Sequence, residues 1–127
     1  MSKGKILIVE DNVDNLALVR FLLERAGYSV LTALNGREAL QVAQQELPDL
    51  ILMDMALPEM DGWSATRELK AIPETQHIPV VALTAYTLPG DRRKAQDAGC
   101  DGFIAKPMNV SGFHKEIESF LSGKSKT

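Results

Sequence analysis

Apolar positions along the chain fall into short continuous runs that alternate with longer stretches of helical period. Continuous apolar runs are typical of strands that are buried on both faces of a parallel sheet. Three such runs occupy residues 6–9, 50–53 and 80–83, where central strands are expected. Residues 28–33 are more mixed and residues 103–105 form a shorter run, so both are predicted to be outer strands.

The stretches between these runs carry the spacing of amphipathic helices. The first two each have one apolar stripe, made by Leu16, Val19, Leu23 and Ala26 in one and by Ala39, Leu40, Ala43 and Leu47 in the other. Asn35 and Gly36 mark the start of the second helix, and Gly27 and Pro48 mark where the two helices end. Three more helices are predicted at residues 63–72, 88–98 and 110–121, and the one at 88–98 is strongly charged.

A regular alternation of strands and helices predicts one α/β fold. Right-handed crossovers between parallel strands place helices on both faces of the sheet. For five strands we expect a doubly wound, flavodoxin-like (βα)5 three-layer sandwich with strand order 2-1-3-4-5. The domain is expected to span residues 5–121, with short tails at 1–4 and 122–127.

Composition narrows the classes of function that the chain can serve. The 127 residues suffice for one core, and a formal net charge of -3 provides no broad positive field for nucleic acid. No apolar run approaches the roughly 18 residues of a membrane span, and the N-terminus does not resemble a signal peptide. We therefore expect a cytoplasmic protein that binds neither nucleic acid nor membrane.

Polar residues follow the predicted strands where each strand ends. Glu10 and Asp11 follow the first strand, Asp54 the third, Thr84 the fourth and Lys106 the fifth. The carboxyl ends of parallel strands lie along one edge of a sheet, where such folds place their functional crevice. We therefore expect three carboxylates, a hydroxyl and an ammonium group to meet there.

Carboxylates at close quarters repel one another, and a divalent cation would relieve that repulsion. Mg²⁺ suits an all-oxygen site and binds few protein oxygens, keeping water and phosphate ligands. With Mg²⁺ bound, the formal charges of the three acids, the lysine and the metal cancel. An aspartate such as Asp54 can attack a phosphoryl donor while cations neutralise the transferred oxygens, so phosphoryl transfer is the chemistry that this set favours.

Four segments carry a resemblance to a known family. Val9-Glu10-Asp11-Asn12, Asp54 through Gly62, Leu83-Thr84-Ala85 and Lys106-Pro107 resemble, in order and spacing, the signature blocks of response-regulator receiver domains of two-component signalling, the CheY-like superfamily. The resemblance covers residues 5–121. It implies a phosphoacceptor switch and no enzyme in the usual sense, with at most self-phosphorylation from small donors and self-dephosphorylation.

The resemblance also implies a role for each site residue. Asp54 would be the phosphoacceptor, and Mg²⁺ would be held by Asp54, Glu10, Asp11 and the backbone carbonyl of Ala56. Thr84 would hydrogen-bond a phosphoryl oxygen, and Lys106 would form an ion pair with it. Thr84 and Phe103 would be the switch residues that alter the surface of the fourth helix, fifth strand and fifth helix.

A sensor histidine kinase or a histidine phosphotransfer protein is implied as the phosphoryl donor. With no output domain in the sequence, the signal is expected to pass to an unidentified downstream protein by contact, or onward as phosphate in a relay. The identity of the donor, the pathway and the oligomeric state stay open.

Three other functions compete with this interpretation. A flavin carrier of the same topology would need small residues and open amides at the first turn, where the chain has acids. An aspartate-based phosphatase would carry its nucleophile after the first strand, with a second acid two residues on. An interaction domain that has lost phosphorylation would have little reason to retain Asp54, Thr84 and Lys106 together.

Overall fold

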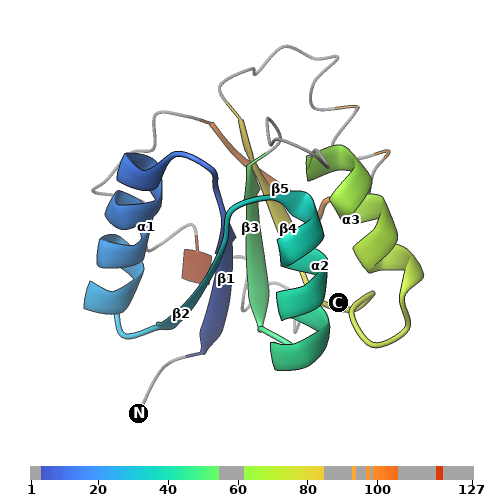
Figure 1. Ribbon diagram of the computed structural model, residues 1–127, viewed down its shortest axis with the longest axis horizontal. Coiled ribbons are helices and arrows are strands. Elements are labelled where there is room, and N and C mark those ends of the chain that lie inside the picture. Colours follow the sequence, from blue (N-terminus) through green and yellow to red (C-terminus); the bar gives the residue numbers. More distant parts are fainter. Residues whose placement is uncertain are drawn as a thin grey trace.

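Five parallel strands form one sheet in the computed structural model, which describes residues 4–54, 62–84 and 99–105, together with Arg93, Asp97, Ile117 and Glu118. Their spatial order is β2-β1-β3-β4-β5 (Figure 1). The strands are β1 Lys5–Val9, β2 Ser29–Ala33, β3 Leu50–Asp54, β4 Val80–Thr84 and β5 Gly102–Ala105. Their number, direction and order confirm the predicted doubly wound, flavodoxin-like sheet.

Helices cover both faces of this sheet. The helix α1 (Val13–Arg25) lies on one face, whereas α2 (Gly36–Glu46) and α3 (Gly62–Ala71) lie on the other (Figure 1). All three lie close to their predicted positions. The expected start of the second helix is confirmed, because the side chain of Asn35 accepts a hydrogen bond from the backbone N–H of Glu38 at 2.8 Å.

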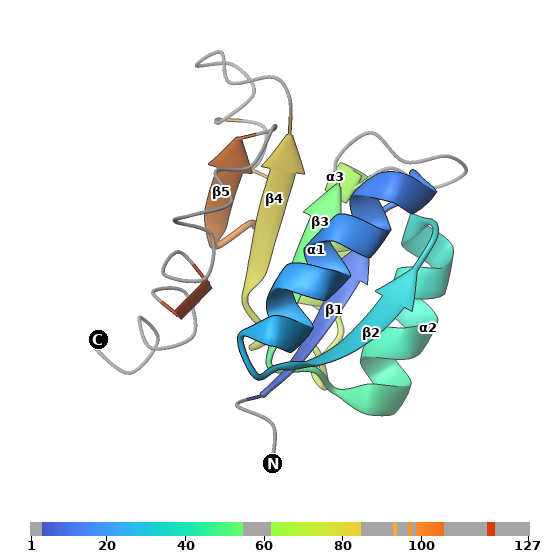
Figure 2. The ribbon, with the colours of Figure 1, turned by 90° about the vertical axis from the view of Figure 1, so that its left-hand side faces the viewer.

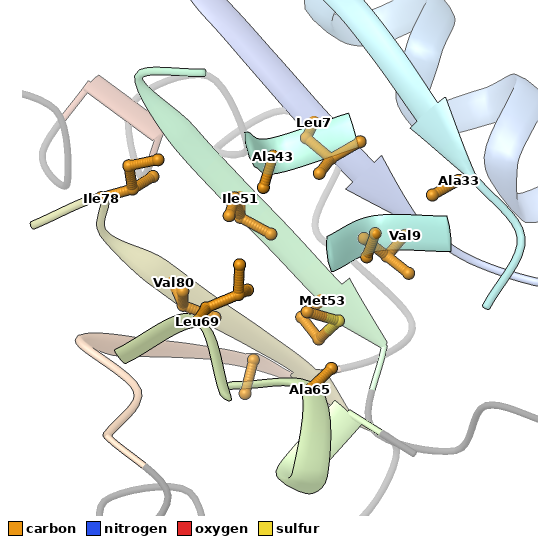
Figure 3. Packing of buried hydrophobic residues seen from close by; sticks show 12 residues of the cluster. Leu7, Val9, Ala33, Ala43, Ile51, Met53, Ala65, Leu69, Ile78 and Val80 are labelled. Carbon is orange, nitrogen blue, oxygen red and sulfur yellow. The ribbon is translucent and has the colours of Figure 1, made fainter. Parts of the chain in front are cut away.

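Side chains alternate between two apolar cores, one on each face of the sheet. The core under α2 and α3 is drawn in Figure 3 and contains Leu7, Val9, Ala33, Ala39, Ala43, Ile51, Met53, Ala65, Leu69, Ile78, Val80 and Ala82. The core under α1 contains Ile6, Ile8, Val19, Leu23, Tyr28, Leu50, Leu52, Val81, Leu83, Ile104 and Ile117. Successive residues of the central strands enter opposite cores, which explains why their sequences read as unbroken apolar runs.

The predicted stripe of the first helix packs as expected, but that of the second is wrong at one position. Leu47 is 50% exposed and has φ 46°, in the left-handed region. Its backbone N–H donates to the carbonyl of Ala43, so Leu47 caps α2 and does not continue it. The left-handed backbone conformation of Leu47 turns its side chain away from the helix face on which Ala39 and Ala43 are buried.

The fourth and fifth predicted helices fall mostly outside the described residues. Ile117, from the fifth, is helical and fully buried in the core under α1. Among the described residues, no helix combines the length and the apolar character that crossing a membrane requires.

Candidate functional site

Strand register brings two acids of distant sequence position side by side. Val9, the last residue of β1, pairs with Met53 of β3, and the next residue in the chain after each is an acid, Glu10 and Asp54. Neighbouring strands lie about 4.8 Å apart, so the side chains of Glu10 and Asp54 lie next to each other. Because side chains alternate along a strand, Glu10 and Asp54 point to the same face of the sheet as Ile8 and Leu52, which are buried in the core under α1.

Local hydrogen bonds hold the turn between β1 and α1. The N–H of Glu10 donates to the carbonyl of Ala33 on β2 at 3.0 Å, which extends the sheet by one residue. The side chain of Asn12 accepts from the N–H of Asn15 at 3.0 Å and so caps α1. Since α1 begins directly after this cap, Asp11 lies in a short turn between the end of β1 and the start of α1.

The result is a compact group of three carboxylates at the carboxyl edge of the sheet. Oxygens of Glu10, Asp11 and Asp54 all lie within 4.8 Å of one another. Glu10 is 2% and Asp54 5% exposed, whereas Asp11 faces solvent. Negative charges this close repel one another, more strongly where water is excluded. A hard divalent cation that binds from the solvent-facing side, at Asp11, fits these three carboxylates. Mg²⁺ matches their all-oxygen chemistry.

The structure therefore brings together the three predicted acids, and it describes the other predicted site residues only in part. Thr84 ends β4 opposite Ala105 of β5, and Phe103 stands opposite Ala82, with the side chains of both outside the described part. Ala56 and Lys106 also lie outside the described residues. Lys106 follows directly after Ala105 in the chain.

An exposed apolar stripe beside the acids was not predicted. Val13, Ala17 and Phe21 follow one another at intervals of four along α1 and are all exposed, Val13 by 71% and Phe21 by 56%. The guanidinium of Arg25 lies 5.9 Å from the centre of the Phe21 ring. The four-residue spacing was visible in the sequence, but the buried stripe of the same helix was the stronger signal.

Comparisons with known proteins agree on one family. Residues 6–118 match the response regulator receiver domain. The polar-differentiation response regulator DivK of Brucella anthropi is 45% identical over 116 residues, which cover 91% of this chain and 94% of DivK.

Solved structures of receiver domains have the same fold. The receiver domain of a sensor histidine kinase from Pseudomonas aeruginosa PAO1, with a magnesium ion coordinated in its active site cleft, superposes with a TM-score of 0.87 at 36% identity, covering 94% of this chain and 98% of that one. The chemotaxis protein CheY4 of Vibrio cholerae gives 0.88 at 31% identity, covering 92% and 98%.

Proposed function

Because the chain belongs to the response regulator receiver domain family, we propose that it is a phosphoacceptor switch in which Asp54 receives the phosphoryl group. Family members act in two-component signalling, so the chain is a signalling protein and not a classical enzyme. The proposed receiver unit spans residues 5–121, with tails at 1–4 and 122–127. The observation that carries the proposal is the meeting of Glu10, Asp11 and Asp54 within 4.8 Å.

The chemistry at Asp54 follows from its position. A carboxylate oxygen of Asp54 attacks phosphorus and forms a new P–O bond, while the bond between phosphorus and the donor breaks and its electrons leave with the donor. Glu10, Asp11 and Asp54, with the backbone carbonyl of Ala56, would hold Mg²⁺. When bound, that ion supplies positive charge next to the phosphoryl oxygens. The Mg²⁺ seen in the Pseudomonas aeruginosa receiver domain supports this choice of metal.

The remaining residues are assigned roles around the transferred group. We assign the hydroxyl of Thr84 to one phosphoryl oxygen and the ammonium of Lys106 to another. Phosphorylation changes the charge at Asp54 from -1 to about -2 and adds strong acceptors, which draws Thr84 inward. Phe103 fills the space that Thr84 leaves, and the surface of β5 and its neighbouring helices changes. The unidentified downstream protein reads this surface, or phosphate passes onward in a relay.

The experiment that tests the proposal is incubation of the purified chain with acetyl phosphate and Mg²⁺. Intact-mass spectrometry should detect one added phosphoryl group, and omitting Mg²⁺ should greatly slow its appearance. A chain that stays unmodified under these conditions would remove the basis for a phosphoacceptor function.

Bound Mg²⁺ is expected to stabilise the fold and to depend on Glu10. A ligand present at a hundred times its dissociation constant adds about 2.7 kcal/mol to the free energy of unfolding. Glu10→Gln removes one of three anionic ligands and should weaken Mg²⁺ binding about tenfold or more, which is about 1.4 kcal/mol. Urea unfolding with and without Mg²⁺ measures both effects.

The matched control for this metal prediction is Glu46→Gln. Glu46 lies at the end of α2, forms an exposed ion pair with Lys5, and is not among the three clustered acids. This variant should keep the full stabilisation by Mg²⁺. Equal loss in both variants would mean that the ion acts by general screening and not at the cluster.

A histidine kinase or a histidine phosphotransfer protein is the proposed donor, and the exposed stripe on α1 is the surface where it docks. The stripe begins at Val13, two residues after Asp11 of the acid cluster, so a protein that covers it lies next to the site. Apolar side chains that stay exposed at the rim of a site gain free energy when a partner covers them.

Phe21→Glu is therefore expected to slow phosphotransfer from a phosphorylated protein donor by about tenfold or more. It should leave labelling by acetyl phosphate unchanged, because that small donor needs no docking surface. Radiolabelled phosphate transferred in a time course gives both rates. Gln44→Glu, which adds the same charge to the exposed side of α2 on the other face of the sheet, is the control. A loss of both activities in Phe21→Glu would contradict the docking role.

A further inference from the structure

A half-buried lysine, Lys70, links the last turn of α3 to the residue that precedes β5. The ammonium of Lys70 donates to the carbonyls of Ile78 at 2.8 Å and Gln76 at 3.3 Å, and to the carboxylate of Asp101 at 2.8 Å. An ammonium group has three protons, so these acceptors use its full capacity. The Lys70 side chain is 20% exposed, less than the basic partner in the other two ion pairs of the described residues, whereas the Asp101 side chain is 47% exposed.

Asp101 is joined twice to the first residue of β4. Its backbone N–H donates to the carbonyl of Val80, and its carboxylate accepts from the N–H of Val80, both at 2.8 Å. The same carboxylate oxygen, Oδ2, receives the Lys70 ammonium. Asp101 therefore fixes which residue of β5 stands opposite which residue of β4, beginning with Gly102 opposite Val81.

Two contacts on the preceding residues hold the same segment against α3. Gly99 has φ +99°, and a side chain there would lie 3.0 Å from Cγ of Lys70, so the lysine stem passes directly over its backbone. The thiol of Cys100 lies 3.9 Å from the hydroxyl of Thr66, and burial raises the pKa of that thiol. Gly99 thus packs closely on Lys70, and Cys100 and Asp101 each bond to a residue of α3 before β5 begins.

The register of β5 needs such an anchor. It has four residues and lies at the edge of the sheet, where within the described residues it pairs with β4 alone (Figure 2). A slip of one residue would move the end of a strand by about 3.3 Å and turn every side chain to the opposite face. Burial of Ile104 in the core under α1 opposes that slip, and the bonds of Asp101 to Val80 oppose it at the start of the strand.

We propose that Lys70 and Asp101 are a positioning pair that locks the register of β5 and thereby sets where Lys106 stands relative to Asp54. The inference rests on the proposed phosphoacceptor function, in which Lys106 contacts the phosphoryl group. Lys106 follows the last residue of β5, so a strand fixed at its first residue fixes the starting point of the lysine at the other end. Neither member of the pair touches the reacting atoms, and both act through the strand.

The first arm of the test measures phosphorylation by acetyl phosphate in Asp101→Ala and Lys70→Met. Misplacement of a reacting group by about 1 Å can cost a hundredfold in rate, so we expect a loss of about ten- to a hundredfold. Mg²⁺ affinity should not change, because Glu10, Asp11 and Asp54 stand on β1 and β3. Lys70→Arg, which can keep the ion pair, should restore most of the rate. Glu46→Ala, which breaks the exposed pair with Lys5, is the control and should leave the rate unchanged.

The second arm separates positioning from general destabilisation. If the pair acts through Lys106, Asp101→Ala should cause no further loss of rate in a Lys106→Ala background. An equal loss in both backgrounds, or a parallel fall in Mg²⁺ affinity, would overturn the proposal and leave the pair a structural brace. An unchanged rate in folded Asp101→Ala would overturn it as well.

A third measurement keeps the inference independent of phosphorylation. Amide hydrogen exchange in β5 should accelerate about tenfold or more in Asp101→Ala, while exchange in β1 and β3 stays as in the wild type. A wild-type chain that takes no phosphoryl group would defeat the proposed function alone. Unchanged exchange in β5 would defeat the positioning pair alone.

Discussion

Asp54→Asn is expected to abolish phosphorylation by acetyl phosphate and Mg²⁺, with no added phosphoryl group detected by intact mass. The amide has nearly the same shape as the carboxylate, but it lacks the anionic oxygen that forms the new P–O bond. Glu10 and Asp11 lie within 4.8 Å of Asp54 but are assigned to the metal alone, so neither should replace it as the acceptor.

Asp14→Asn is the matched control for this loss. Asp14 lies in the first turn of α1, close to the cluster in sequence, and is exposed. Its variant should be phosphorylated at the wild-type rate. Residual labelling of Asp54→Asn at the same stoichiometry as the wild type would place the acceptor elsewhere and refute the assignment of Asp54.

Asp54→Asn, which abolishes phosphorylation, is expected to increase the stability of the metal-free protein. Without metal, removing one of three neighbouring negative charges should raise the free energy of unfolding by about 1 kcal/mol or more. The added stability conferred by Mg²⁺ should fall at the same time. We expect the inactive variant to be the more stable one because the function requires like charges to be held close together.

Leu52→Ala is expected to cost about 3 kcal/mol or more of the free energy of unfolding. Leu52 is fully buried in the middle of β3, in the core under α1, and its removal leaves a cavity that the surrounding strands cannot close. Domains of this size have a total stability of about 5–15 kcal/mol, so the loss is a large share. Urea denaturation followed by circular dichroism gives the difference directly.

Leu31→Ala is the matched comparison, because it makes the same change of leucine to alanine at a less buried position. Leu31 lies on the edge strand β2 and is only partly buried against the core under α2 and α3. Its truncation should cost about half as much, since part of the side chain already contacts water. Equal costs at the two positions would contradict the expectation that the loss follows the burial of the side chain.

Some features could not be found by reading the chain alone, for reasons that are specific to each. The stripe of α2 continues to Leu47 by spacing, yet a left-handed backbone at that residue turns it to solvent. Residues 70 and 101 are 31 positions apart, and nothing in their neighbourhoods indicates that one carboxylate will bind both Lys70 and the backbone of Val80. Such contacts depend on how α3 packs on the sheet, which sequence periodicity does not specify.

The apolar runs and the polar residues that end them were enough to predict the fold, its strand order and the clustering of three acids at one edge of the sheet. This works because buried strands of a parallel sheet must be apolar on both faces, and because their carboxyl ends share one edge. Packing alone decided that Val9 pairs with Met53, which is what brings Glu10 and Asp54 together. It also decided which face of α1 stays exposed and what holds β5 in register, since these depend on distances between segments that no local pattern encodes.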